Sequence, residues 1–419
     1  MTHLDKLLEG VEVEWKTLGE VAELVRGNGL QKIDFTESGI PAIHYGQIYT
    51  YYGLSTTKTK SFVSPELAKT LRKVDTGDVV ITNTSENLED VGKAVVYLGK
   101  IQAVTGGHAT IIKPSELLLG KYFAYFSQTE DFARQKRKYA KGTKVIDVSA
   151  TDMSKILIPI PPLSVQKEIV RILDTFTELT AELTAELTAE LTARKKQYNY
   201  YREELLSPTM VNGKWLMVNE EVEWKSLGDE SIGKFIRGGG LQKKDFIETG
   251  VGCIHYGQIY THYGTYTTET KAFVSEEFAK KARMAKYGDL VIATTSENDE
   301  DVCKAVAWLG EDEIAISSDA CFYTHSLNPK YVAYYFQTEQ FQKQKRPFIT
   351  GTKVRRVNAD DLAKIKIPVP SLEEQERIVS ILDKFDILTT SISEGLPKEI
   401  ELRKKQYEYY RDKLLRFTV

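Results

Sequence analysis

The most regular pattern of hydrophobic and polar positions runs from Thr177 to Arg194, where the sequence reads TELTAELTAELTAELTAR. The four-residue unit TAEL occurs three times in succession between Thr180 and Leu191. Because Ala, Glu and Leu are strong helix formers, the pattern predicts one continuous helix. Successive leucines turn about 40° around its axis, which favours a short contact with another helix over a long coiled coil. Each unit adds about 6 Å, so the helix is interpreted as a spacer or, more simply, as a helical linker.

The chain repeats itself on both sides of this helix. EWKTLGE at Glu14–Glu20 returns as EWKSLGD at Glu223–Asp229, 209 residues later. The same offset separates RKKQYNYYR at Arg194–Arg202 from RKKQYEYYR at Arg403–Arg411. The protein is therefore a tandem duplication of two copies of about 200 residues, a usual domain size.

Two strands are expected at matching places in the copies. IHYGQIYT at Ile43–Thr50, which returns at Ile254–Thr261, is aromatic and β-branched and predicts a strand. TGDVVITNTSEN at Thr76–Asn87 runs from a Gly-Asp turn through an apolar strand into a polar end. Its partner in the second copy is YGDLVIATTSEN at Tyr287–Asn298.

Helices are expected after these strands. An aromatic helical pattern begins at Gly120 in the first copy and is interpreted as core. Proline-ended strands then lead into long helices that start near Ser164 and Ser371. In the second of these helical arms, Gly395 and Pro397 are expected to interrupt the helix.

The composition excludes several classes of protein. With 42% hydrophobic residues and no apolar run that could span a bilayer, the chain is expected to be cytoplasmic and to have no membrane partner. Its cysteines, Cys253, Cys303 and Cys321, all lie in the second copy, which argues against a disulfide framework. A zinc site built from them with nearby histidines would have no counterpart in the first copy, where Gly92 corresponds to Cys303. No metal site is predicted.

The net charge of −3 does not indicate DNA binding, but two basic runs do. Between Asp131 and Lys144 the sequence DFARQKRKYAKGTK carries six Lys and Arg residues against one acid. The second copy repeats the bias from Lys343 to Arg356, and both runs surround a GTK tripeptide. Such runs supply salt-sensitive phosphate contacts, although a solvated helical face would have the same composition.

Polar side chains in loops and at strand ends are the candidates for reading bases. RGNGLQK at Arg26–Lys32 and RGGGLQK at Arg237–Lys243 hold Arg, Gln and Lys, which suit guanine, adenine and phosphate respectively, or form a plain turn. Hydroxyl and amide groups at strand ends match base edges but also cap turns. The predicted DNA contacts are Arg26, Asn28, Gln31, Lys32, His44, Tyr45, Gln47, Thr84, Ser85, Asn87, His108, Lys141, Thr143, Lys144, Arg237, Gln242, Lys243, His255, Tyr256, Gln258, Thr295, Ser296, Asn298, Thr352, Lys353 and Arg355.

At these residues the chain resembles the specificity subunits of type I restriction-modification systems. The resemblance covers nearly the whole chain and rests on the duplication, IPIPPLSVQKEIVRILD and IPVPSLEEQERIVSILD, the RKKQYxYYR arms and the TAEL units, which are similar to those of the type IC branch. It implies an α+β fold in which two similar mixed α/β target-recognition domains are separated by two long antiparallel helical regions with pseudo-twofold symmetry. The expected segments are residues 1–162 for the first recognition domain, 163–207 for the central helical spacer, 208–371 for the second recognition domain and 372–419 for the C-terminal helical region.

The resemblance also implies a subunit that does no chemistry itself. Each domain would read one half of a split sequence in double-stranded DNA, and the repeat number would be associated with the spacing of the halves. Two modification subunits would bring S-adenosylmethionine and methylate adenine N6, and restriction subunits would bring ATP and magnesium for translocation and cleavage. No cofactor is expected on this chain. The expected partner surface, in which some tyrosines belong to the interhelix core, comprises Arg194, Lys195, Tyr198, Tyr201, Arg202, Arg403, Lys404, Tyr407, Tyr410 and Arg411.

Two other functions stay open on the sequence. A stand-alone metal-dependent nuclease could use Asp78 with Asp90 and Lys93, or their second-copy counterparts, although the Asp-x-x-Lys spacing departs from a common nuclease arrangement. A defence-related scaffold could bind the same partners without binding DNA. NPKY at Asn328–Tyr331 is similar to an adenine methyltransferase motif but is better interpreted as a helix start.

Because the two recognition domains are close relatives, the half-sites are predicted to be related and the target nearly palindromic. Differences between the half-sites are expected to come from divergent stretches. The first candidate is AVTGGHATIIK at Ala103–Lys113 against AISSDACFYTH at Ala315–His325, and the second is Leu88 against Asp299.

Overall fold

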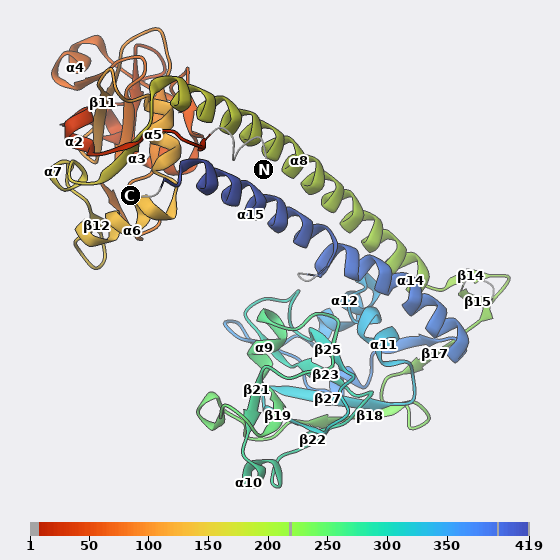
Figure 1. Cartoon of the computed structure of the whole chain (residues 1–419). Coiled ribbons are helices and arrows are strands. Elements are labelled where there is room, and N and C mark those ends of the chain that lie inside the picture. Colours follow the sequence, from red (N-terminus) through yellow and green to blue (C-terminus); the bar gives the residue numbers. More distant parts are fainter. Residues whose placement is uncertain (1–7, 218–219, 392–393, 418–419) are drawn as a thin grey trace. The chain divides into compact units, whose positions relative to one another are not determined.

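The computed structural model describes residues 8–217, 220–391 and 394–417. The chain forms two compact units: unit 1 comprises Met1–Ala185 and Glu401–Val419, and unit 2 comprises Glu186–Ile400. Each unit is a mixed α+β structure with two main sheets (Figure 1). The predicted fold class and duplication are confirmed. The compact units differ from the sequence copies, because the end of the chain belongs to the unit that holds its beginning.

Unit 1 is built on a five-stranded sheet of order β2-β11-β7-β9-β4 and a four-stranded sheet of order β5-β3-β10-β6. Neighbouring strands are antiparallel except in the pairs β3–β10 and β4–β9. The central strands β7 and β9 are buried along their whole length, which explains their unbroken apolar, β-branched sequences. The bounds are β2 Ala22–Arg26, β3 Ile40–Ile43, β4 Ser55–Thr56, β5 Ser61–Val63, β6 Arg72–Val74, β7 Val79–Thr82, β9 Ala94–Tyr97, β10 Ala103–Thr105 and β11 Ala109–Pro114.

Unit 2 repeats both sheets, with strand orders β18-β27-β23-β25-β20 and β21-β19-β26-β22. A three-stranded sheet, β14-β15-β16, belongs to this unit as well. The bounds are β14 Thr209–Val211, β15 Lys214–Met217, β16 Glu220–Glu221, β18 Gly233–Arg237, β19 Val251–Ile254, β20 Tyr266–Thr267, β21 Ala272–Val274, β22 Met284–Ala285, β23 Leu290–Ala293, β25 Ala305–Trp308, β26 Ile314–Ile316 and β27 Ala320–His325.

Short strand pairs complete each unit. The predicted proline-ended strands are confirmed, because β13 pairs with β1 and β29 pairs with β17, so that Pro159 lies opposite Trp15 and Pro368 opposite Trp224. Each pair is an isolated two-stranded ribbon, where a missing proline N–H is tolerated at an edge. A second pair in each unit joins β8 to β12 and β24 to β28. The bounds are β1 Glu14–Thr17, β8 Thr84–Ser85, β12 Ile146–Asp147, β13 Leu157–Ile160, β17 Glu223–Ser226, β24 Thr295–Ser296, β28 Arg355–Arg356 and β29 Lys366–Val369.

The aromatic helices belong to the core, as predicted. Tyr122 of α5 and Tyr331 of α11 are fully buried and donate hydrogen bonds of 3.0 and 2.9 Å to the carbonyls of Pro159 and Pro368. Asn328 caps α11 by accepting from two backbone N–H groups, so NPKY is a helix start. The helices around the sheets are α2 Leu18–Val21, α4 Pro65–Thr70, α5 Gly120–Phe126, α6 Glu130–Tyr139, α7 Ala150–Met153, α10 Glu276–Ala279, α11 Pro329–Tyr335, α12 Glu339–Lys345 and α13 Ala359–Leu362, with 3-10 turns η1 Lys32–Asp34, η2 Lys243–Asp245 and η3 Arg346–Phe348.

A buried glutamine fixes the start of a long helix in each unit. Gln166 of α8 (Leu163–Leu206) accepts a 2.9 Å hydrogen bond from Leu119 N and donates one of 2.9 Å to Pro161 O. Gln375 of α14 (Leu372–Thr390) makes the equivalent bonds at 2.8 and 2.9 Å. These side chains are 0% and 1% exposed, so the SVQKE and LEEQE motifs serve to dock each helix on its own sheet.

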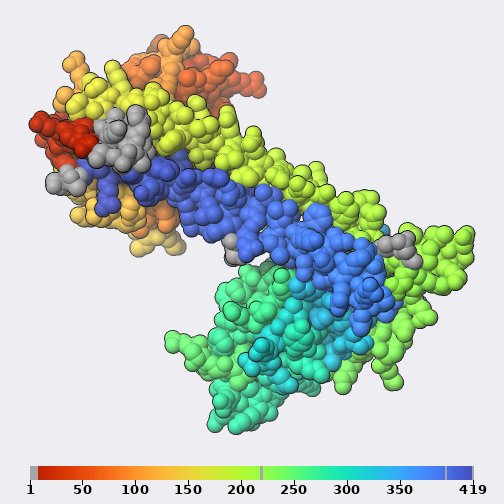
Figure 2. Space-filling model, turned by 45° about the vertical axis from the view of Figure 1, so that its right-hand side comes forward, coloured from red at the N-terminus to blue at the C-terminus, as the bar shows by residue number. Residues whose placement is uncertain are grey.

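The final turns of α15 (Gly395–Leu415) pack antiparallel on the first half of α8 inside unit 1, as Figures 1 and 2 show. Thr177 Oγ1 lies 3.0 Å from the Tyr407 hydroxyl, and the rings of Phe176 and Tyr410 are 5.7 Å apart. In unit 2 the second half of α8 packs on α14, with the ring of Tyr198 6.3 Å from that of Phe385. Each unit is therefore completed by an RKKQYxYYR arm from the other sequence copy.

The helix predictions are largely confirmed. α8 runs unbroken through all the TAEL units, and the second arm is interrupted between Thr390 and Gly395. Gly395 adopts a φ of +76°, which favours glycine. Pro397 lies in the first turn of α15, where its missing N–H has no helical partner to lose, so the proline does not break the helix itself.

The strand predicted for IHYGQIYT is wrong. β3 ends at Ile43, and Tyr45–Thr50 forms helix α3, with His44 Nδ1 accepting from Gly46 N at 3.2 Å as the helix cap. The second copy does the same in α9, Tyr256–Thr261. The cap and the burial of Ile48, on the inner side of the helix, outweigh the β propensity of the aromatic residues.

Candidate nucleic-acid interface

Four segments of unit 1 meet where β7 ends. The backbone of buried Asn83 donates to His108 O and accepts from Val148 N, each at 2.9 Å. Its side chain also donates to Val148 O at 3.1 Å. Beside this junction, Arg26 Nε donates to Gly107 O at 3.2 Å. The sequence did not single out Asn83, whose bonds bring the predicted residues of three separate loops to one edge.

A histidine and tyrosine cluster lies on this edge. The ring of Tyr45 lies between those of His44 and His108, with centroid distances of 4.5 and 4.8 Å. Thr84 Oγ1 is 3.1 Å from His108 Nδ1. Burial lowers the pKa of His44, and the nearby charges of Lys32 and His108 lower it further. The imidazole of His44 is 6% exposed and caps α3, so the prediction that it contacts DNA is corrected; it packs against the ring of Tyr45 instead.

The loop after β8 is fixed by its own side chains. Asn87 Oδ1 accepts from Asp90 N at 2.8 Å, while Asn87 Nδ2 donates to the Asp90 carboxylate at 2.8 Å. Asn298 makes the same two bonds in unit 2, at 2.7 Å each. Both asparagines therefore shape a loop whose tip in unit 1 carries Leu88, 40% exposed.

The glycine-bracketed loop at Arg26–Lys32 packs closely against the backbone at Gly106. A Cβ on Gly27 would lie 2.2 Å from Gly106 O, so only glycine fits there. The Asn28 side chain donates to Thr70 O at the end of α4 and accepts from Arg72 N at the start of β6, at 2.9 Å each. This corrects the prediction that Asn28 offers its amide to a base. Gln31 and Lys32 are exposed beyond it, as are Gln242 and Lys243 in unit 2.

Two more predicted base readers point inward. Gln47 Nε2 donates to Ser61 Oγ at 2.5 Å, and its Oε1 accepts from Tyr52 at 3.4 Å. Gln258 Oε1 accepts from His255 N at 2.9 Å. Both amides serve their own unit because the segment that holds them is a helix, not a strand, so their predicted DNA contacts are corrected.

The basic runs contain one buried lysine each. Lys136, 5% exposed, donates to Glu89 O at 3.2 Å and Val91 O at 2.6 Å. Burial lowers its pKa to about 8. Lys345 makes the same bonds to Glu300 O and Val302 O at 3.1 and 2.8 Å. The expectation of phosphate contacts is wrong for both, because an amphipathic helix turns every third or fourth residue inward; these lysines hold the loop after β8 or β24.

Other residues of the first basic run form ion pairs on the surface. Arg137 lies 2.7 Å from Glu130, and Lys141 lies 3.0 Å from Asp152. Thr143 and Lys144 are exposed in the loop that follows, as are Thr352 and Lys353 in unit 2. These four residues stay predicted phosphate contacts.

Unit 2 builds the same edge. The His255 and Tyr256 rings are 4.6 Å apart, and Arg237 Nε donates to Ser318 O at 3.4 Å. Thr295 and Ser296 pair with β28 as Thr84 and Ser85 pair with β12. Arg355 Nε lies 2.7 Å from the Asp299 carboxylate, an ion pair that has no counterpart at Ile146 and Leu88 in unit 1.

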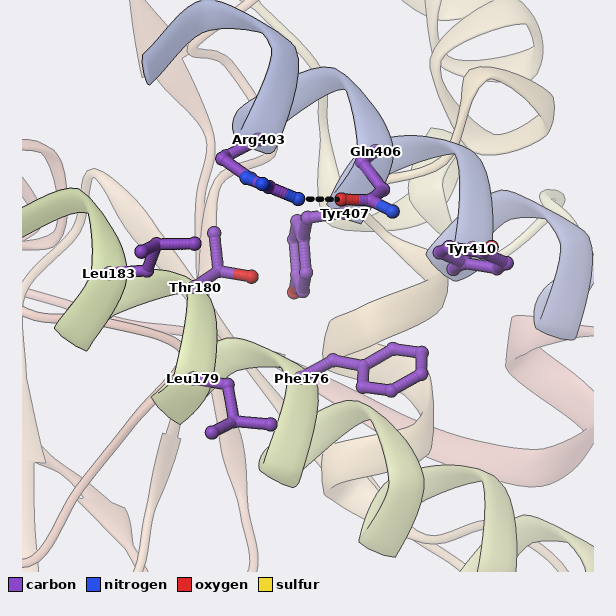
Figure 3. A pocket seen from close by; sticks show the side chains of 8 residues that line it. All are labelled: Phe176, Leu179, Thr180, Leu183, Arg403, Gln406, Tyr407 and Tyr410. Carbon is purple, nitrogen blue, oxygen red and sulfur yellow. Dashed lines mark hydrogen bonds between the residues drawn. The ribbon is translucent and has the colours of Figure 1, made fainter. Parts of the chain in front are cut away.

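The predicted partner surface is partly occupied within the units. In unit 1 a pocket of about 210 Å³ separates α8 from α15, and Arg403, Tyr407 and Tyr410 line it with Leu179 and Thr180 (Figure 3). The Tyr407 ring lies between the two helices, where its hydroxyl contacts Thr177, as described above. These tyrosines therefore belong to the packing of α15 on α8.

Unit 2 uses the corresponding residues in the same way. Tyr198 is 6% exposed, and Arg202 lies over its ring at 5.3 Å and donates to Gln337 at 3.3 Å. Tyr201 stacks on Phe385 at 5.4 Å. The prediction of a partner surface is corrected for Tyr198, whose burial leaves it no outer face.

The outer face of the arms carries other residues. Lys195 and Lys404 are exposed, and Arg194 and Arg411 bind neighbours on their own helices, Glu190 at 3.4 Å and Asp412 at 2.7 Å. Tyr200 and Tyr409, which are not among the predicted contacts, are 63% and 62% exposed. The sequence does contain a signal for these two residues, because both copies carry a tyrosine at this position of the arm and a helix pair alone does not need it.

The arrangement does not assemble a nuclease site in either unit. Asp78 and Asp90 lie at opposite ends of β7. Asp78 immediately precedes the strand, whereas the backbone N–H of Lys93, which contacts Asp90 O, donates to Thr82 at the end of the strand. Asp78 is paired with Lys113 at 3.0 Å. In the part of the chain that the structure describes, no three His, Cys, Asp or Glu side chains gather as metal ligands. Over the same described ranges, no helix has the length and apolarity of a membrane span.

Two like units, each with a polar and aromatic edge and a docked long helix, define a duplicated recognition protein. The family model described as type I restriction modification DNA specificity domain matches residues 10–193 and 219–402. The chain therefore belongs to the specificity subunits of type I restriction-modification systems, and it is the non-catalytic DNA-specificity subunit of such a complex.

Two relatives match along nearly their whole length. The type I restriction enzyme EcoR124I/EcoR124II specificity subunit of Escherichia coli is 35% identical over 434 residues, covering 100% of this chain and 97% of the relative. The putative specificity subunit S.HindORF215P of Haemophilus influenzae is 32% identical over 435 residues, covering 100% and 99%. The predicted family and its type IC-like character are confirmed.

Solved structures show the same fold. A chain from a study of complex assembly and conformational transition of the type I R-M system aligns with a TM-score of 0.68 at 18% identity, covering 97% of this chain and 98% of that one. The HsdS subunit of Thermoanaerobacter tengcongensis aligns with a TM-score of 0.55 at 16% identity, covering 97% of each.

Proposed function

We propose that each unit reads one half of a split sequence in double-stranded DNA through the edge where β7 or β23 ends. The observation that supports this is the repetition of the edge. Arginine, a histidine–tyrosine pair and a Thr-Ser strand pair occur together at the same edge of both units, beside the exposed loops that carry Gln31 and Lys32 or Gln242 and Lys243. Such groups supply the base-edge and phosphate contacts of DNA readers.

The division of the chain follows from this assignment. We propose residues 1–162 and 208–371 as the two recognition domains, residues 163–207 as the central helical spacer and residues 372–419 as the C-terminal helical region. Because their edges share most polar residues, the two half-sites are related, and the target is nearly palindromic if the domains face opposite strands.

The helices are the proposed docking site of two modification subunits, which carry S-adenosylmethionine, while restriction subunits carry ATP and magnesium. On the arms, Lys195 and Lys404 with the exposed Tyr200 and Tyr409 are the contacts that their exposure favours. We also propose that the TAEL units set the spacing between half-sites, because each changes the length of α8 by about 6 Å without breaking it.

The test is single-molecule methylome sequencing of cells that express this chain with its proposed modification subunit. The expected result is N6-methyladenine at two short half-sites with a fixed unspecified gap. Deleting Thr180–Leu183 removes one TAEL unit, which shortens the helix by about 6 Å and rotates its ends by about 40°. The gap should shorten by about two base pairs, since base pairs are stacked about 3.4 Å apart.

The matched control deletes only Thr180 and Ala181, which rotates the ends by about 200° and should abolish methylation. A gap that stays constant after the four-residue deletion would reduce α8 to a linker. A continuous methylated motif with no gap would overturn the proposal that the two units read separate half-sites.

A further inference from the structure

The two recognition edges share an arginine, a histidine–tyrosine pair and a Thr-Ser strand pair, and they differ in one patch beside these residues. The register of β11 on β7 and β27 on β23 pairs Ala109 with Thr82 and Ala320 with Ala293, so His108 corresponds to Asp319. The stretches Ala103–Lys113 and Ala315–His325, aligned from their first residues, would instead place His108 opposite Ala320, one residue later. Arg26, His44, Tyr45, Thr84 and Ser85 all have identical counterparts in unit 2.

Four unlike positions adjoin one another in this frame. In unit 1, Asp147 pairs with Thr84 and Ile146 with Ser85 across β8 and β12. His108 lies 3.1 Å from Thr84, and Leu88 projects from the loop that follows. One strand pair therefore brings Leu88, His108, Ile146 and Asp147 to a single patch.

In unit 2 the same positions hold Asp299, Asp319, Arg355 and Arg356. Arg356 pairs with Thr295 and Arg355 with Ser296 across β24 and β28. The Asp299 carboxylate lies 2.7 Å from Arg355 Nε and holds that guanidinium in place. Arg356 is exposed beside it.

The charge of the patch affects the shared histidine in opposite ways. His108 helps to lower the pKa of His44, after burial and Lys32. Asp319 opposes the lowering of the pKa of His255 by burial and Lys243. Residue 108 or 319 therefore lies close enough to the shared histidine–tyrosine cluster to change the electrostatic potential that this cluster presents to DNA.

The chemistry of the two patches suits different base pairs. Apolar side chains such as Leu88 and Ile146 match the methyl group of thymine. An arginine matches O6 and N7 of guanine, and an aspartate accepts from N4 of the paired cytosine. Arg355 is preorganised by two bonds, from Nε to Asp299 and from Nη1 to Gly351 O, which leaves Nη2 and the second N–H of Nη1 to face a base.

On the basis of the proposed function, we propose that these four positions determine the difference between the half-sites, so that unit 2 reads a G·C pair where unit 1 reads an A·T pair. The other positions of the half-sites are shared because the residues around the patch are shared.

The experiment transplants the patch within the full chain, expressed with its modification subunit. The variant Leu88→Asp, His108→Asp, Ile146→Arg, Asp147→Arg gives unit 1 the residues of unit 2. Methylome sequencing should show the first half-site changing from A·T to G·C at one or two positions, with a preference of about tenfold to hundredfold. The second half-site and the gap should stay constant.

Two controls keep the result specific. The reverse transplant, Asp299→Leu, Asp319→His, Arg355→Ile, Arg356→Asp, should change only the second half-site. In the second control, Lys58→Glu, unit 1 receives the residue type that unit 2 has at the equivalent position, Glu269. Lys58 lies near Thr56, at the opposite end of the sheet from the patch, so the motif should stay unchanged.

Methylation that continues at the unchanged first half-site would overturn the inference while leaving the proposed function intact. If the transplant abolishes methylation, binding of the purified complex to duplexes with either first half-site decides. Preference for the G·C duplex supports the inference, and preference for the original duplex or equal binding to both overturns it. Failure of the proposed function is distinct, since the parent chain would then give no split motif.

Discussion

Units 1 and 2 share their sheets, their docked helices and most of their recognition edges, yet each is completed by the arm of the other sequence copy. Unit 1 receives Tyr407 from α15, which follows the second copy, and unit 2 receives Tyr198 from α8, which follows the first. The repeat in sequence and the repeat in structure therefore begin at different residues. An arm and the sheet that precedes it in sequence therefore belong to different compact units.

The units also differ beneath the surface. In unit 1 the buried Asp78 carboxylate lies 3.0 Å from Lys113 Nζ, which also pairs with Asp75 at 2.8 Å. In unit 2 the equivalent Asp289 is 2% exposed and has Thr324 in place of that lysine. Burial raises the pKa of Asp289. The frames are the same, but the buried carboxylate of unit 2 has the Thr324 hydroxyl as its neighbour where unit 1 has the Lys113 ammonium.

The largest effect is expected from the glutamines that dock the helices. Gln166→Leu removes partners from Leu119 N, Pro161 O and Leu117 O, and unsatisfied buried groups are costly, so unit 1 should lose about 3 kcal/mol. The loss of stability of unit 2 in Gln375→Leu should be about 1 kcal/mol smaller than that of unit 1 in Gln166→Leu, because Gln375 lacks the third bond that Gln166 makes. Denaturant unfolding with hydrogen exchange resolved on each unit measures the two losses of stability. Equal losses would contradict the role given to the third hydrogen bond of Gln166.

The buried carboxylates give the next effect. Lys113→Thr makes unit 1 like unit 2 and should cost about 2 kcal/mol at pH 7. Thr324→Lys should stabilise unit 2 in return. A raised pKa means that the folded state keeps its proton longer, so the stability of unit 2 falls as pH rises from the ordinary Asp value through the raised one. Hydrogen exchange of β7 and β23 against pH measures this, and an unaltered pH profile after Thr324→Lys would contradict it.

Substitutions of the buried Lys136 and of the exposed Lys144 should weaken DNA binding in different ways. Lys136→Met releases the carbonyls of Glu89 and Val91 and loosens the recognition loop, so DNA affinity should fall about tenfold. Its dependence on salt should stay the same, because no phosphate contact is lost. Lys144→Ala should weaken binding less but reduce the slope of log affinity against log salt by about 0.9. Titrations at several salt concentrations separate the two; a reduced slope for Lys136→Met would restore the phosphate interpretation.

The smallest effect concerns the helix contact. Asp386 in unit 2 stands where unit 1 has Thr177, and burial raises the pKa of Asp386. Ionisation therefore destabilises unit 2 as pH rises through the raised pKa. Asp386→Thr should stabilise unit 2 by about 1 kcal/mol at pH 7 and have little effect near pH 3, where the carboxyl is protonated in both states. Thermal unfolding at both pH values checks this, and a loss of stability at pH 7 would count against it.

Much of this architecture could be predicted from the sequence, because repeats, proline-ended strands and TAEL units are local signals. The exchange of arms could not, since RKKQYxYYR reads the same whichever sheet it packs on. IHYGQIYT was mistaken for a strand because β propensity was weighed without the His44 cap. Lys136 and Gln47 were mistaken for DNA contacts because composition does not tell which face of a helix is buried.

The most direct test of the account is a pair of substitutions at the position that both edges share, Tyr45→Ala and Tyr256→Ala, each followed by methylome sequencing with the modification subunit. Each tyrosine packs against the histidine of its own unit, at 4.5 and 4.6 Å. We expect each substitution to relax the sequence preference of one half-site and to leave the other half-site and the gap unchanged. Equal relaxation of both half-sites by either substitution would contradict the claim that the two units are separate readers.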